Sequence, residues 1–169
     1  MSGRRSYQVV AAVIRRQDTV LLVCQQGPAD AEPYWSLPGG VVEVGELLTE
    51  ALAREVWEET GLPLLTLGPL LYVCQSDTPA DATQPGQETL AHVFAATVPP
   101  GEPAHADPDE LISSAAFVPL AEAITRLAAK GWRPMCEPIV AYLRGEAAPG
   151  MIWCYRRQAD GSEALIARG

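Results

Sequence analysis

Apolar and polar residues follow one another along this chain with two different periods, one typical of strands and one typical of helices. Two apolar runs near the N-terminus, 8–14 and 19–24, are separated by the polar residues 15–18, which predicts a β-hairpin that turns at Arg16, Gln17 and Asp18. Further strand-like segments are 64–75, 89–98, 115–118 and a late pair at 151–155 and 164–167, and the helical segments are 47–60, 120–130 and 134–143. Loops rich in proline, glycine or polar residues lie at 27–34, 76–88 and 99–109. This order predicts an α/β fold in which helices cover a mixed sheet.

The helix predicted over 47–60 has the most regular apolar stripe. The residues of this stripe are Leu47, Leu48, Ala51, Leu52 and Val56. Residues three or four positions apart share one face of a helix, so this face is expected to pack on the core. Gly61 can adopt the left-handed conformation that ends a helix, and Pro63 prevents the helix from continuing.

The last turn of the same helix carries three acids on one patch of surface. Glu55, Glu58 and Glu59 lie at positions i, i+3 and i+4, where the helix dipole is negative and cations are preferred. Arg54 is the one cation in that turn and cannot neutralise all three carboxylates. A solvated acidic helix face is the simpler interpretation, but the acids come with a glycine turn and a fixed arginine. Clustered carboxylates of this kind favour a site for Mg²⁺ or Mn²⁺.

The acids belong to a longer pattern that runs from Gly40 to Leu62. Glu46 follows Gly40 after five residues, and the run from Arg54 to Glu59 follows after seven more. This pattern resembles the signature of the Nudix hydrolase family at every defined position, and the segments 35–39 and 115–120 are also similar to that family. The resemblance implies an α/β/α sandwich with a mixed β-sheet between helices. It also implies Mg²⁺- or Mn²⁺-dependent hydrolysis of a pyrophosphate bond in a nucleoside diphosphate linked to another group, in a nucleotide, nucleotide sugar or nucleoside triphosphate.

Roles for individual residues follow from the same resemblance. The implied metal ligands are Glu55, Glu58, Glu59 and the backbone carbonyl of Gly39. Glu46 and Arg54 resemble the pair that braces the preceding loop against the helix, and they complete the catalytic set with the three glutamates. Gly40 allows a backbone turn where a Cβ would obstruct the site. One of the glutamates is a candidate acceptor for the proton of the attacking water.

Several features outside this pattern leave alternatives open. An additional acid could act as base or ligand, and the candidates are Asp107, Asp109, Glu110 and, more weakly, Glu88. Aromatic side chains either stack on a base or pack in the core, and the candidates are Tyr34, Trp35, Tyr72 and Trp132. The segment 132–169 covers the substrate cleft, forms a homodimer contact or completes the core. A non-catalytic Nudix-fold nucleotide sensor is the alternative function, although no metal-binding glutamate is missing here.

Composition narrows the possible partners. The length of 169 residues suits one domain, and we expect a single domain over 1–169 with 132–169 packed on it. With 12 lysines and arginines against 21 aspartates and glutamates, the net charge of -9 disfavours membranes and non-specific nucleic-acid binding. The resemblance to the Nudix family implies a small nucleotide-derived substrate as the partner. Cys24, Cys74, Cys136 and Cys154 are too far apart in sequence for a metal knuckle, which predicts reduced cysteines and a cytoplasmic protein.

Overall fold

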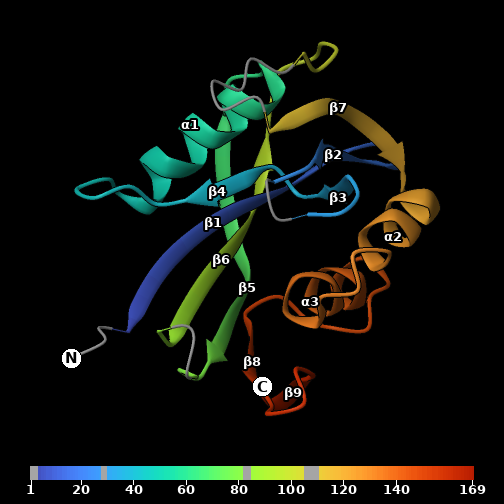
Figure 1. The fold of residues 1–169 in the computed structure, drawn as a ribbon. Coiled ribbons are helices and arrows are strands. Elements are labelled where there is room, and N and C mark those ends of the chain that lie inside the picture. The colour runs from blue at the N-terminus through green and yellow to red at the C-terminus, as the bar shows by residue number, and fades with distance from the viewer. Residues whose placement is uncertain (1–3, 28–29, 82–84, 105–110) are drawn as a thin grey trace.

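The computed structural model describes residues 4–27, 30–81, 85–104 and 111–169. Its strands form one mixed sheet in the order β3-β2-β1-β6-β5-β8-β9, with β4 paired to β1 and β7 paired to β2. The strands are β1 (Arg5–Arg16), β2 (Thr19–Gln25), β3 (Tyr34–Ser36), β4 (Gly39–Val41), β5 (Thr66–Thr78), β6 (Gln87–Thr97), β7 (Ile112–Pro119), β8 (Met151–Arg157) and β9 (Glu163–Arg168). The helices are α1 (Leu48–Thr60), α2 (Leu120–Ala128) and α3 (Arg133–Leu143). Helix α1 lies on one side of the sheet, and α2 and α3 lie on the other (Figure 1).

Strand β1 separates two apolar cores because its side chains alternate between the two faces of the sheet. Val10, Ala12 and Ile14 pack with the apolar stripe of α1, whereas Val13 packs with residues of α2 and α3. The strand pairs in parallel with β6 along 5–14 and in antiparallel with β4 and β2 on its other edge. The predicted α/β/α sandwich with a mixed sheet is confirmed.

Most of the predicted elements are present with small shifts in their ends. The N-terminal hairpin turns at Gln17, whose φ of 52° is left-handed, and Arg16 pairs with Thr19. The late strand pair forms the antiparallel hairpin β8–β9. The strand expected to end at residue 75 continues to Thr78. The pattern does not predict β3 and β4, because three-residue strands flanked by proline and glycine are too short to show alternation.

Helix α1 follows the predicted pattern, but the residue before it, Leu47, does not. Leu52 and Val56 are fully buried in the core between α1 and β1. Gly61 ends the helix with a φ of 65°, and its N–H donates to the carbonyl of Trp57 at 2.7 Å. The prediction that Leu47 belongs to the buried stripe is wrong, because its side chain is 65% exposed. Leu47 lies at the cap, where its N–H donates to the Glu50 carboxylate at 2.9 Å.

The C-terminal segment enlarges both the sheet and the core. Strand β8 pairs in parallel with β5, and β9 pairs with the outer edge of β8. Ile139 of α3 and both Trp153 and Tyr155 of β8 are buried in the core that also holds Val13.

The four cysteines are free, with Cys74 and Cys136 buried. Within the described ranges, no helix is long and apolar enough to cross a membrane.

The packing of α1 predicts a sharp contrast between Leu52 in the helix and Leu47 at its cap. Leu52→Ala should lower the free energy of unfolding by about 2–5 kcal/mol, because it leaves a cavity in a closed core. Leu47→Ala is the matched control and should change it by less than about 0.5 kcal/mol, because that side chain already contacts water. Urea unfolding of both variants measures the difference. Equal losses would show that α1 packs in another orientation.

Candidate active site

Two glycines allow β4 to approach both α1 and β1 closely. A Cβ on Gly40 would overlap the carboxylate of Glu55, so the predicted reason for glycine at this position is confirmed. A Cβ on Gly39, whose φ is 151°, would overlap the carbonyl oxygen of Val10 on β1. A larger residue at Gly40 would therefore push β4 away from the last turns of α1, and a larger residue at Gly39 would push it away from β1.

Arg54 connects the loop before α1 to the helix itself. Its Nε and Nη2 donate to the two carboxylate oxygens of Glu46 at 2.9 and 3.0 Å, and Nη2 also donates to the carbonyl of Val41 at 3.2 Å. The N–H of Glu43 donates to the same Glu46 carboxylate at 3.0 Å. The hydrogen bonds from Arg54 are the main reason that the pKa of Glu46 lies below its ordinary value. The predicted contact between Glu46 and Arg54 is thus present as a bidentate pair.

Arg54 also contacts two of the three glutamates in the last turns of α1. Its Nη1 donates to Glu55 at 2.9 Å and to Glu58 at 3.2 Å, so one nitrogen lies between two carboxylates. Arg54 also pairs with Glu46, so its single positive charge is shared among three carboxylates. The hydrogen bonds to Glu46 and, to a smaller extent, Glu55 raise the pKa of Arg54, although burial opposes them.

Glu59 points toward the backbone of β4. Its side chain is buried, and one oxygen accepts a hydrogen bond from the N–H of Gly39 at 2.7 Å. In the ladder between β1 and β4, Ala12 N–H donates to Pro38 and Val42 N–H donates to Gln8, which places the peptide groups of Gly39 on the edge away from β1. The carbonyl of Gly39 therefore faces the same side as its N–H, toward α1.

The electrostatics of the acidic group suit a divalent cation. Burial raises the pKa of Glu55. The negative charges of Glu58 and Glu46 raise this pKa further, whereas Arg54 lowers it. Among the described residues, no group of three acid, histidine or cysteine side chains is close enough together to hold a metal ion. The carboxylates instead turn toward Arg54 and the Gly39 N–H, as repelling charges do when a cationic partner is near. Arg54 Nη1 places positive charge between two of these hard oxygen donors, so the donor set fits Mg²⁺ or Mn²⁺.

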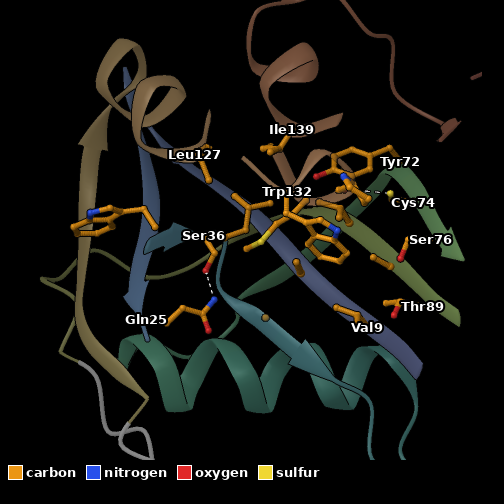
Figure 2. Close-up of a pocket in the computed structure, with 18 residues that line it drawn as sticks. Val9, Gln25, Ser36, Tyr72, Cys74, Ser76, Thr89, Leu127, Trp132 and Ile139 are labelled. Carbon is orange, nitrogen blue, oxygen red and sulfur yellow. Dashed lines mark hydrogen bonds between the residues drawn. The ribbon is translucent and has the colours of Figure 1, made fainter. Parts of the chain in front are cut away.

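A cavity of about 230 Å³ lies on the opposite face of β1, between the sheet and α3 (Figure 2). Trp35, Tyr72 and Trp132 line it together with Gly39, which thus borders both the cavity and the acidic group. Tyr34, another aromatic candidate, instead lies under Lys130, whose Nζ is 3.4 Å from the ring centre. The walls are mostly apolar, and a few polar side chains are exposed among them. The cavity is suited to a flat organic group next to the acidic site.

Other residues singled out from the sequence lie apart from this group or outside the structure. Asp107, Asp109 and Glu110 lie outside the described residues. Glu88 accepts a hydrogen bond from Gln75 and lies 3.8 Å from Arg4, at the start of β6. The sequence pattern did not single out Ser76 and Thr89, which line the cavity. Both are polar residues at inward positions of apolar strands. This feature can be recognised only when the register of β5 and β6 is known.

Comparison with known proteins agrees with this geometry. Residues 5–137 match the family model described as NUDIX domain. The chain belongs to the Nudix family. Members of this family typically depend on a divalent metal ion. A Nudix hydrolase of Nitrosomonas europaea superposes with a TM-score of 0.66 at 28% identity, covering 86% of this chain and 93% of that one.

Two curated Nudix relatives match shorter segments. Human 8-oxo-dGDP phosphatase is 36% identical over 90 residues, which are 53% of this chain and 24% of that protein. The CTP pyrophosphohydrolase of Escherichia coli is 40% identical over 55 residues, which are 32% of this chain and 41% of that protein. The aligned segments thus span less than half of each of these two relatives.

The role of Arg54 in this Nudix site is testable through stability. Arg54→Ala should lower the free energy of unfolding by about 1–3 kcal/mol, between the values for exposed and buried ion pairs, and should also reduce activity. Arg156→Ala removes a more exposed pair with Asp77 and should cost less than about 1 kcal/mol. Chemical unfolding of both variants measures the contrast. If Arg54→Ala unfolds like the parent and only KM rises, Arg54 contacts phosphate instead of bracing the loop.

The raised pKa of Glu55 predicts a pH-dependent stability in chelator. The folded protein binds a proton at Glu55 more tightly than the unfolded chain does, so protonation of Glu55 stabilises the fold. This contribution is full below the ordinary pKa of 4.5 and is lost as pH rises through the raised pKa. Glu55→Gln cannot ionise and should melt no lower than the parent at neutral pH, with any advantage disappearing below the ordinary pKa. Thermal melts in chelator across this pH range measure it, with the exposed Glu122→Gln as control. A clearly lower melting temperature at neutral pH would show that the ionised Glu55 stabilises the fold through Arg54.

Proposed function

We propose that this chain is a hydrolase that cleaves a pyrophosphate bond in a nucleoside diphosphate linked to another group, and that it requires Mg²⁺ or Mn²⁺. One observation carries the proposal. The acidic last turns of α1, held by Arg54, lie against the same glycine that borders an apolar cavity. A phosphorylated ligand with an aromatic group needs this combination of a cation site and an apolar pocket.

The relatives indicate which substrates to test first. The human relative is named for 8-oxo-dGDP and the Escherichia coli relative for CTP. Both names describe a nucleotide with a phosphoanhydride bond. We infer that the substrate of this chain is a nucleoside di- or triphosphate or a related nucleotide conjugate.

The side chains of this site have distinct roles in the proposed reaction. The carboxylates of Glu55, Glu58 and Glu59 and the Gly39 carbonyl would hold a divalent cation, which supplies charge neutralisation at the pyrophosphate and a water of lowered pKa. Arg54 and Glu46 keep the loop and the helix in register, so that the carboxylates stay on one side of β4. A carboxylate of this group accepts the proton of the attacking water. Burial of Glu59 limits its motion and orients it toward Gly39.

A nucleotide panel with and without divalent cation tests the function. In Mg²⁺ or Mn²⁺ we expect phosphate or pyrophosphate release from 8-oxo-dGTP, dGTP or CTP, or formation of AMP and ribose 5-phosphate from ADP-ribose, and no reaction in chelator. Glu58→Gln should reduce turnover by orders of magnitude and leave the melting temperature in chelator unchanged, because the amide keeps the shape and removes the charge. Glu122→Gln on α2 is the control and should retain full activity. Tight nucleotide binding without hydrolysis would instead identify a nucleotide sensor.

A further inference from the structure

The cavity beside the active site has the shape of a slot with two different walls. One wall is the sheet, where alternate residues of β1 and β6 face inward, including Ala11 and Ala91. These small side chains make a low surface across the two strands. The other wall comes from the start of α3 and includes Trp132 and Met135. A flat ring can therefore enter between the sheet and the indole.

Trp132 lies in this slot without being packed into the core. Trp132 is 40% exposed, in contrast to Trp153, which is 3% exposed. Figure 2 shows the indole extending from the start of α3 over the strands that form the sheet wall of the slot. The backbone carbonyl of Trp132 accepts hydrogen bonds from Met135 and Cys136 in the first turn of α3, so the backbone of this residue is fixed. A partly exposed indole on a fixed backbone is a stacking surface for an aromatic ligand.

The hairpin β8–β9 holds this indole in place. The indole Nε1 of Trp132 donates to the carboxylate of Glu163 on β9 at 3.3 Å. The neighbouring Arg133 donates to the backbone carbonyl of Glu163 at 2.5 Å and to the carboxylate of Glu137 at 2.6 Å. Tyr155 of β8 donates to the same Glu137 at 2.8 Å. The family match ends at residue 137, and β8 and β9 come after it. These two strands thus hold Trp132, the residue that covers the slot.

The far end of the slot carries two hydroxyl groups. Ser76 on β5 and Thr89 on β6 are direct partners in the antiparallel ladder, and both line the cavity. Figure 2 shows both side chains at the same end of the pocket. Hydroxyl groups donate and accept hydrogen bonds, so this pair suits the nitrogen and oxygen atoms at the edge of a nucleobase. The acidic group lies across Gly39, where the phosphates of the same ligand would be.

We propose that Trp132 stacks on the nucleobase of the substrate, that Ser76 and Thr89 face the base edge, and that Glu163 is a positioning residue for Trp132. This inference rests on the proposed function, because it assigns the base-binding part of the same site. The hairpin β8–β9 then contributes to substrate selectivity without contacting the phosphates. Stacking on an aromatic ring depends on the ligand having a base, so substrates without a base should not depend on Trp132.

The first experiment compares steady-state kinetics of Trp132→Ala and Trp132→Phe. For dGTP and CTP, Trp132→Ala should raise KM about ten-fold, as expected from the loss of one base–aromatic stack, with kcat nearly unchanged. Trp132→Phe should recover most of the affinity. Inorganic tripolyphosphate, which has no base, should be bound equally by parent and variants in inhibition assays. An unchanged KM for both nucleotides in Trp132→Ala would overturn the proposal.

The second experiment measures binding in chelator, independently of hydrolysis. Guanosine should quench the indole fluorescence of the parent, and Trp132→Phe should abolish most of this quenching, whereas Trp57→Phe on α1 should keep it. Glu163→Ala should weaken guanosine binding, and Glu163→Gln should restore it because the amide oxygen still accepts the indole hydrogen bond. Ile166→Ala, an exposed change on the same strand, should have no effect.

The two experiments distinguish failure of this inference from failure of the proposed function. Normal nucleotide hydrolysis with no effect of Trp132→Ala on KM or quenching would overturn the stacking role and leave the hydrolase assignment intact. Quenching by guanosine that depends on Trp132, in a protein that hydrolyses no nucleotide of the panel, would support the slot and overturn the hydrolase assignment. Equal weakening by Glu163→Gln and Glu163→Ala would overturn the positioning role of Glu163.

Discussion

The arrangement of the acidic site depends on the guanidinium of Arg54. Two carboxylates about 4 Å apart repel each other by roughly 4 kcal/mol at an effective dielectric constant near 20, and the negative end of the helix dipole adds to this cost. Arg54 offsets the repulsion because its planar group reaches Glu46 with two nitrogens while Nη1 lies between Glu55 and Glu58. A lysine has one ammonium group and cannot make these separate contacts from one position. The chain can therefore keep a highly charged group half-buried without losing its helix.

The contacts of Arg54 are useful only because β4 comes very close to α1. Gly40 leaves room for the Glu55 carboxylate, and Gly39 leaves room for the carbonyl of Val10. This short strand then presents its peptide N–H to Glu59. The close packing of β4 on α1 therefore needs both features. The two glycines remove steric obstruction, and the arginine offsets the repulsion among the carboxylates that this packing brings together.

The sequence was sufficient for features that depend on nearby residues. The end of α1 at Gly61 and its buried face at Leu52 follow from helical periodicity and backbone preference, which act over a few residues. Leu47 was wrongly placed in the core because an apolar residue at the cap continues the periodic pattern although the helix has not yet begun. The Glu46–Arg54 contact was foreseen through the family resemblance, and its bidentate geometry required the structure.

Features that depend on distant segments could not be obtained in this way. The tether between Trp132 and Glu163 joins the start of α3 to β9, and no local pattern encodes the direction in which the hairpin β8–β9 returns. The pairing of Ser76 with Thr89 required the register of two long strands with bulges. The partner of Glu59 is a backbone N–H, which has no sequence signature because every residue except proline carries one.

The geometry of β1 and β4 separates the charged side of the site from its apolar side. Alternation along β1 turns Val10 toward α1 and Ala11 toward the cavity, so one ladder separates the charged side from the apolar side. Gly39 is the position where the two sides meet, because its N–H binds Glu59 while its backbone borders the cavity. A nucleotide bound as we propose would extend past this residue. In the proposed function, substitutions on the α3 side would therefore change which base is accepted, while the acidic group on the other side would keep its structure.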